Sequence, residues 1–261
     1  MLVSGGDDGT VRIWNTDTGK RLRTFAPKLK WVNTGAITDA HGRGLVAAAG
    51  SDHMVRVWDI TTGAPTQALS GHSAAVTGLA FLHLEDRAVL ASCSYDGTIK
   101  TWDVEAGRVL HSWPAQDDWP TALAAASAAE GTVLVSEGAT GAVRVWDSHG
   151  TPRQVLAAYR GRVHALALTT SRDTTTAAVG GLDGSLTLWD VESPTSTSDG
   201  KRAAPTPGNH GRSSRSRATR TAMATFAPTS AGIYAANPSQ SAPGRHPPAP
   251  SPAGPSPVPK R

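Results

Sequence analysis

The sequence predicts an all-β protein made of repeated four-stranded antiparallel units. Five tryptophans recur at a nearly constant spacing, and the residues before each alternate between apolar and polar side chains. The tryptophans are Trp14, Trp58, Trp102, Trp146 and Trp189, separated by 44, 44, 44 and 43 residues. The phrases around them are DGTVRIWN, DHMVRVWD, DGTIKTWD, TGAVRVWD and DGSLTLWD. These matches in register indicate five copies of one supersecondary unit.

Each unit is expected to hold four short strands. The alternation before the tryptophan, as in Val143, Arg144 and Val145, predicts a strand with one buried face. Upstream runs such as LVAAAG, AVLASCS and TVLVSEG predict a strand joined to it by a tight turn, for example at Asp96-Gly97. A turn glycine and a further strand follow the tryptophan, and runs such as VTGLAF at 76–81 and VHALAL at 163–168 supply another. Four antiparallel strands in about 44 residues describe one blade of a β-propeller.

The repeated phrase resembles that of the WD-repeat β-propellers, which are named for a Trp-Asp pair. The pair is present in four units, as in Trp102-Asp103, whereas the first unit has Trp14-Asn15. The Ala- and Arg-rich composition favours a bacterial member of the family, or a fragment of one. In that family a His, a Ser or Thr, an Asp and the Trp form a hydrogen-bonded structural tetrad. The matching residues here are His72, Ser92, Asp96 and Trp102.

The other units depart from the tetrad pattern. The histidine position holds Lys28, Gln116, and Tyr159 or Arg160; Ala48 and Val179 replace the serine, and Thr140 replaces the aspartate. The resemblance covers residues 2–192, and we expect these units to depend on packing more than on the tetrad.

The predicted strand count does not close a ring. The first unit lacks its opening strand and the last lacks its fourth, which leaves three full blades and two partial ones, whereas family members usually have seven. We expect a truncated or misannotated reading frame. A closed ring of five sectors and completion by another chain are the alternatives.

Charge and composition divide the chain into a predicted propeller over 1–192 and a predicted disordered basic tail over 193–261. The first part has 16 Lys+Arg and 20 Asp+Glu, and the second has 9 Lys+Arg and one acid. The tail holds 13 of the 18 prolines and none of the eight tryptophans, so we expect too little apolar surface to order it. Its basic cluster raises nucleic acid or an anionic surface as a partner, against the alternative of a solvated linker. The cluster comprises Arg212, Arg215, Arg217 and Arg220.

The sequence contains none of the motifs that would identify an enzyme. It has no phosphate-binding G-x-x-x-x-G-K-[ST] loop, no H-E-x-x-H pair and no G-x-S-x-G elbow, and its histidines have no metal-ligand spacing. No stretch is apolar enough to span a membrane, and the single Cys93 excludes an internal disulfide framework. We therefore expect a non-catalytic cytoplasmic protein without cofactors.

Recognition is expected on the top face, defined as the end of the blades where the chain runs into each first strand. Aligning the units through their tryptophans places Trp31, Ala75, Trp119 and Arg162 at one equivalent position. Because Trp and Arg often dominate binding energy, Trp31, Trp119 and Arg162 are the candidate protein-binding residues. The alternative is that the two tryptophans pack over their own blades in place of the missing tetrads.

The resemblance implies a scaffold or adaptor that binds proteins through its loops. One alternative is the regulatory or sensor propeller of a larger bacterial signalling protein fused to a kinase or NTPase. The other is binding to nucleic acid or an anionic surface through the basic tail.

Overall fold

The chain folds into eighteen described strands in five antiparallel sheets. The computed structural model describes residues 1–26, 31–40, 42–84, 87–115, 119–128, 131–158, 163–171, 174–181 and 184–191. Three sheets have four strands, and the first and last have three. The prediction of an all-β propeller architecture with three full and two partial blades is therefore confirmed.

Each sheet is built from strands that follow one another in sequence. Sheet 1 contains β1 (Leu2–Gly5), β2 (Val11–Trp14) and β3 (Arg21–Phe25), and sheet 2 contains β4 (Val32–Ala40), β5 (Arg43–Gly50), β6 (Val55–Asp59) and β7 (Pro65–Leu69). Sheet 3 contains β8 (Val76–Leu84), β9 (Arg87–Ser94), β10 (Thr98–Asp103) and β11 (Arg108–Pro114). Sheet 4 contains β12 (Pro120–Ala128), β13 (Gly131–Gly138), β14 (Ala142–Asp147) and β15 (Pro152–Ala158), and sheet 5 contains β16 (Val163–Ser171), β17 (Thr174–Gly181) and β18 (Leu186–Val191).

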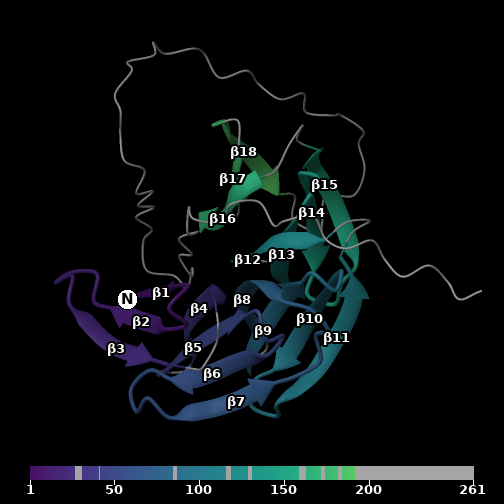
Figure 1. Ribbon diagram of the computed structural model, residues 1–261. Coiled ribbons are helices and arrows are strands. Elements are labelled where there is room, and N and C mark those ends of the chain that lie inside the picture. The colour runs from purple at the N-terminus through teal and green to yellow at the C-terminus, as the bar shows by residue number, and fades with distance from the viewer. Residues whose placement is uncertain are drawn as a thin grey trace, which may run out of the picture.

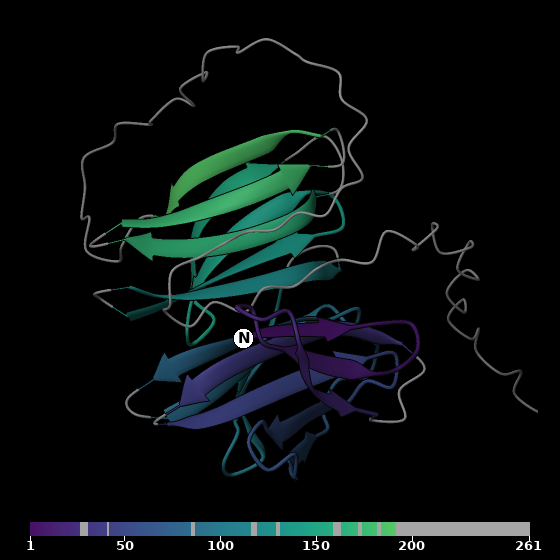
Figure 2. The same cartoon turned by 90° about the vertical axis from the view of Figure 1, so that its left-hand side faces the viewer.

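The five described sheets form an open arc. Strands β4, β8, β12 and β16 pack side by side on the inside of the arc, and β3, β7, β11 and β15 lie outside (Figure 1). Figure 2 looks at the open side, where β16–β18 lie above and β1–β3 below. The alternative of a closed ring of five sectors is therefore wrong.

In sheets 1 to 4 the residue after the repeat tryptophan closes the turn into the next strand. Oδ1 of Asp103 accepts a hydrogen bond from the backbone N–H of Ala106 at 2.9 Å, and Asn15 accepts from Thr18 at 2.8 Å in the same way. A glycine with positive φ completes the turn, as at Gly107 with φ 66°. Either Asp or Asn supplies the required acceptor, which explains why Asn15 replaces the usual aspartate without loss of the turn.

The core is divided into four hydrophobic clusters, each at the junction between two consecutive sheets. In every junction, apolar residues of one sheet meet the repeat tryptophan of the next. Thus Trp58 packs with sheet 1, Trp102 with sheet 2, Trp146 with sheet 3 and Trp189 with sheet 4. Each repeat tryptophan after the first therefore marks one junction between sheets, which explains why the tryptophans recur at a regular interval in the sequence.

Several sequence predictions lie outside the described residues. These include Arg162 of the candidate top-face site, the predicted tail with Arg212, Arg215, Arg217 and Arg220, and the boundary at residue 192. In the part of the chain that the structure describes, no helix has the length and apolar character needed to cross a membrane.

Candidate functional site

Sheet 3 brings the four predicted tetrad residues into one hydrogen-bonded chain. Nε1 of Trp102 donates to Oγ of Ser92 at 2.8 Å, and Oγ lies 2.7 Å from Nε2 of His72. On the other side of the imidazole, Nδ1 lies 2.8 Å from Oδ2 of Asp96. The tetrad thus links the loop before β8 to β9, to the β9–β10 turn and to β10.

The partners determine where the protons of the tetrad lie. Asp96 accepts, so Nδ1 of His72 carries the proton and Nε2 is left as an acceptor for the Ser92 hydroxyl. Burial lowers the pKa of His72, against the opposing effect of Asp96, and this keeps the imidazole neutral. Burial opposes ionisation of Asp96, but hydrogen bonds from Thr98, Ser73 and His72 outweigh it and lower its pKa to about 2.

The order Ser92–His72–Asp96 reproduces the hydrogen-bond pattern of a catalytic triad, but the serine is sealed inside the sheet. Its side chain is fully buried and its oxygen already accepts the indole N–H of Trp102. A nucleophilic serine must reach the substrate carbonyl, and no substrate atom can approach this hydroxyl. The arrangement therefore stabilises the sheet, because it satisfies an imidazole and an indole N–H that are both buried.

Parts of this chain of bonds recur among the described residues of two other sheets. Trp14 donates to Ser4 and Trp146 donates to Ser136, each at 2.8 Å. The equivalent serine position is occupied by alanine in sheet 2 and by valine in sheet 5, and the repeat tryptophans of these sheets pack in the hydrophobic clusters at the junctions with the preceding sheets. The described residues therefore contain one complete tetrad and two serine–tryptophan pairs.

The model of the WD40 family, described as "WD domain, G-beta repeat", matches residues 1–15, 19–59, 63–103 and 150–190. The chain belongs to the WD40-repeat family. The match leaves out residues 104–149, although 108–114 complete sheet 3 and most of the remainder forms sheet 4 with the same strand order as sheets 2 and 3. No curated protein matches the chain. WD40 repeats generally mediate protein–protein interactions, and propellers built from them are typically non-catalytic.

The structure places Trp31, Ala75 and Trp119 at equivalent positions, as the alignment through the repeat tryptophans predicts. Each residue directly precedes the first strand of its sheet. The carbonyl oxygen of Ala75 accepts from the backbone N–H of Tyr95 at 3.0 Å, and that of Trp119 accepts from Ala139 at 2.9 Å. Both bonds join residues twenty positions apart, so the same backbone geometry recurs at this end of the two sheets.

Both top-face tryptophans are exposed. Trp31 is 43% exposed and Trp119 is 54% exposed, whereas Trp58, Trp102 and Trp146 are buried. Part of each indole is nevertheless covered, so packing over the tryptophan's own sheet stays the alternative prediction. The exposed indole surface is the property that a recognition site requires.

Tyr95 is a further top-face aromatic that the sequence comparison misses. It lies in the β9–β10 turn, is 41% exposed, and its backbone bonds to Ala75. Sheet 3 has alanine where its neighbours have tryptophan, and Tyr95 supplies the aromatic side chain from the adjacent turn. Its position in a different loop hides this equivalence from an alignment of the repeats. Sheets 2, 3 and 4 thus each present one exposed aromatic residue at the same end.

The innermost strands are fastened to each other by side chains at a recurring bulge. The pairing of β4 with β5 shifts at Asn33, and that of β8 with β9 shifts at Thr77. Nδ2 of Asn33 donates to the carbonyl of Val76 at 3.0 Å, and Oγ1 of Thr77 donates to that of Pro120 at 2.7 Å. Each bulge side chain therefore bonds to the next sheet close to the top face, which holds the aromatic residues on a rigid base.

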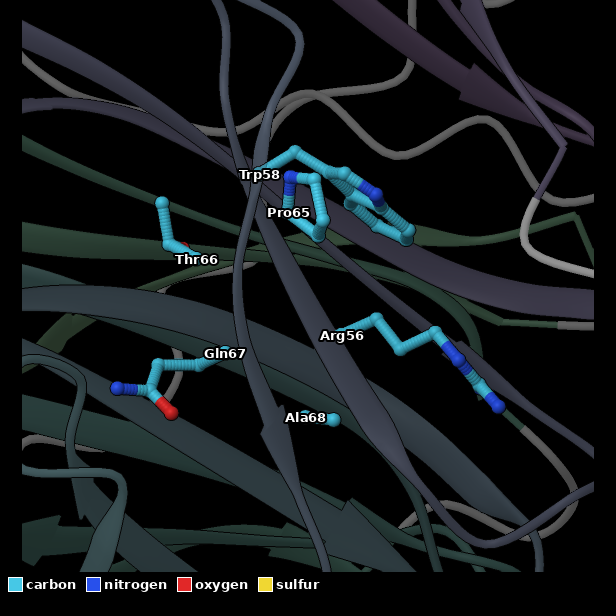
Figure 3. Close-up of a pocket in the computed structure, with 6 residues that line it drawn as sticks. All are labelled: Arg56, Trp58, Pro65, Thr66, Gln67 and Ala68. Carbon is cyan, nitrogen blue, oxygen red and sulfur yellow. The ribbon is translucent and has the colours of Figure 1, made fainter.

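A hollow in sheet 2 lies on the outer part of β6 and β7 (Figure 3). It is lined by Arg56, Trp58, Pro65, Thr66, Gln67 and Ala68. Arg56 is already paired with Asp52 at 2.6 Å, and Figure 3 shows Pro65 beside the Trp58 ring. The lining contains no carboxylate, imidazole or thiol, and its one hydroxyl, that of Thr66, donates to the carbonyl of Val57 at 3.0 Å.

One pair of histidines is brought together from different sheets. The rings of His111 and His149 meet edge to face with centroids 5.1 Å apart, although the sequence gives them no metal-ligand spacing. Within the described ranges no third His, Cys, Asp or Glu joins them or any other such pair in a group that could hold a metal ion. Two imidazoles are fewer ligands than a protein zinc site uses.

Proposed function

We propose that this WD40 chain is a non-catalytic scaffold that binds a protein partner through Trp31, Tyr95 and Trp119 on its top face. The observation that carries the proposal is the exposure of one large aromatic side chain at the same end of each of three consecutive sheets. Aromatic side chains contribute large contact areas at a small cost in conformational entropy, which is why they dominate many protein interfaces.

The neighbouring structure supports this role. The residues lie where rigid strands begin, and the Asn33 and Thr77 bonds tie those strands together. A partner would therefore meet a surface that is already ordered, and little entropy would be lost in arranging it. Asp96 of the complete tetrad directly follows Tyr95 in the β9–β10 turn, and its bond to His72 fastens that turn to the loop before β8.

The experiment uses photo-crosslinking in the native host followed by reconstitution with the purified partner. A photoreactive amino acid replaces Tyr95, and a control chain carries it at Val155, which is 64% exposed on the outer strand β15. We expect a specific adduct from position 95 only. Trp31→Ala and Trp119→Ala should each weaken binding of the purified partner by about 30-fold, the effect typical of an aromatic hot spot.

The stability of the variants separates recognition from packing. Since Trp31 is 43% exposed and Trp119 is 54% exposed, the two substitutions should lower the free energy of unfolding by less than the roughly 3–5 kcal/mol that truncation of a fully buried tryptophan costs. Variants that lose stability but bind the partner as well as the original chain would refute the proposed interface. Equal crosslinking from positions 95 and 155 would also refute it.

A further inference from the structure

The four junctions between sheets share one chemistry. The third strand of each sheet presents side chains toward the following sheet, as Val143 and Val145 of β14 do toward sheet 5. The second strand of the following sheet covers them with residues such as Ala177 and Val179. All four of these side chains are fully buried. The internal junctions therefore show what covers this position of the repeat.

In sheet 5 the two positions equivalent to Val143 and Val145 are not covered by any described strand. The strand register shows that Leu188 is the equivalent of Val145, because Leu188 pairs with Ala178 in sheet 5 as Val145 pairs with Val135 in sheet 4. By the same register, Leu186 is the equivalent of Val143. Leu186 is 73% exposed and Leu188 is 66% exposed. These two side chains define the leucine face of sheet 5. Leaving two leucines in water at positions that are buried throughout the rest of the arc is unfavourable.

Sheet 1 presents the complementary half of a junction at the other end of the arc. Leu2 pairs with Trp14 as Leu134 pairs with Trp146. Leu134 and Trp146 are buried against sheet 3, whereas Leu2 and Trp14 are half-buried and belong to none of the four clusters. Leu2 and Trp14 define the tryptophan face of sheet 1. The described arc thus ends in the two halves of the junction that it forms four times internally.

We propose that the leucine face of sheet 5 binds the tryptophan face of sheet 1 in a second copy of this chain. Within one molecule the two faces lie on opposite sides of the open part of the arc, and no hydrophobic cluster of the described residues joins them (Figure 2). The contact between copies is head-to-tail, because two different faces meet. Such a contact gives a ring where the rotation between copies closes and an open helical chain of copies where it does not.

The first test compares self-association of the 261-residue chain with that of three variants by analytical ultracentrifugation. Leu188→Asp blocks the leucine face, Leu2→Asp blocks the tryptophan face, and Val155→Asp is the matched control on an exposed residue of neither face. The original chain and the control should associate increasingly with concentration. Each blocking variant should weaken association by about 100-fold, since a charge is placed in an apolar contact.

Mixing the two blocked variants tests the head-to-tail arrangement directly. Leu2→Asp retains an intact sheet 5 and Leu188→Asp retains an intact sheet 1, so an equal mixture should form a one-to-one dimer that grows no further. A mixture that stays monomeric would overturn the proposal. So would an original chain that remains monomeric at every concentration, or blocking variants that associate as the control does.

Crosslinking provides a measurement that does not depend on the aspartate variants folding. A chain carrying both Leu2→Cys and Leu188→Cys is treated with a short bis-maleimide. Cys93 does not compete, because it is fully buried and burial raises the pKa of its thiol to about 12. Covalent multimers are expected. A crosslink within single chains would show that the arc closes on itself, and the proposal would be wrong.

Discussion

Replacing Ser92 by alanine tests whether the tetrad of sheet 3 is a structural element. The Ser92 oxygen accepts the Trp102 indole N–H at 2.8 Å and its hydroxyl meets His72 Nε2 at 2.7 Å, and the serine and indole are almost completely buried. The substitution leaves two buried polar groups without this partner, and each unsatisfied group costs about 1–3 kcal/mol. We expect the free energy of unfolding to fall by about 3 kcal/mol.

The matched control is Ser4→Ala in sheet 1. Ser4 accepts from Trp14 with the same 2.8 Å geometry, but both residues are half-buried, so water replaces the lost bond. Its cost should stay below about 1 kcal/mol. Urea unfolding at neutral pH, followed by far-ultraviolet circular dichroism, gives both values. If Ser92→Ala costs no more than Ser4→Ala, the hydrogen bonds of the tetrad do not stabilise the sheet.

A double-mutant cycle then assigns the effect to the pair. Ser92→Ala, His72→Ala and the double variant should show a coupling of about 1 kcal/mol or more, because the two side chains share one bond inside the sheet. Additive costs would mean that the serine acts through packing alone.

Three further predictions concern the turns and the titration of the tetrad. Gly19→Ala should lower the free energy of unfolding in urea by about 1 kcal/mol through its φ of 66° alone, since nothing lies within 4 Å of the added Cβ. Gly150→Ala should lower it further, because the added Cβ would overlap the Trp113 indole ring. Equal losses in the two variants would contradict this reasoning. Asp103→Asn should unfold like the original chain, whereas Asp103→Ala should lose about 1 kcal/mol with the turn hydrogen bond; a loss in the Asn variant would show that the charge matters. Because the pKa of His72 is lowered in the folded chain, the unfolded chain binds a proton at a higher pH than the folded chain does, so the free energy of unfolding should fall as the pH drops below 6.5. The lowered pKa of Asp96 should reduce the free energy of unfolding again as the pH falls from 3.8 to about 2. His72→Gln should flatten the first of these losses in unfolding curves measured from pH 7 to pH 5.

The local features of the fold were predictable because the repeat encodes them in neighbouring residues. The alternation ending at Trp146 and the glycine that follows it place a strand and a turn without reference to the rest of the chain. The tetrad was also within reach, since the turn at Asp96 and the strand at Ser92 lie in one unit. Five copies of the phrase make each such inference stronger than a single unit would allow.

The recognition surface was only partly predictable, because residues at different positions of the repeat can reach the same end of the sheets. Aligning the repeats found Trp31 and Trp119, since both occupy the same numbered position of their units. Tyr95 reaches the top face from another loop, and only the bond from its backbone to Ala75 shows that it belongs there. Likewise His111 and His149 are far apart in the chain, and the contact between sheets 3 and 4 brings their rings together.

The exposure of Leu188 illustrates a property that no pattern within a unit can encode. Its strand has the same alternation as the strand of Val145, and an amphipathic pattern predicts that both residues face an apolar neighbour. Whether they do depends on the sheet that follows, which is present for Val145 and not described for Leu188. A repeat of this kind therefore specifies a face and the chemistry of its partner, while the neighbouring unit decides whether the face is covered. Since Leu2 and Trp14 have the matching chemistry and are also incompletely covered, the described arc contains both components of one further junction.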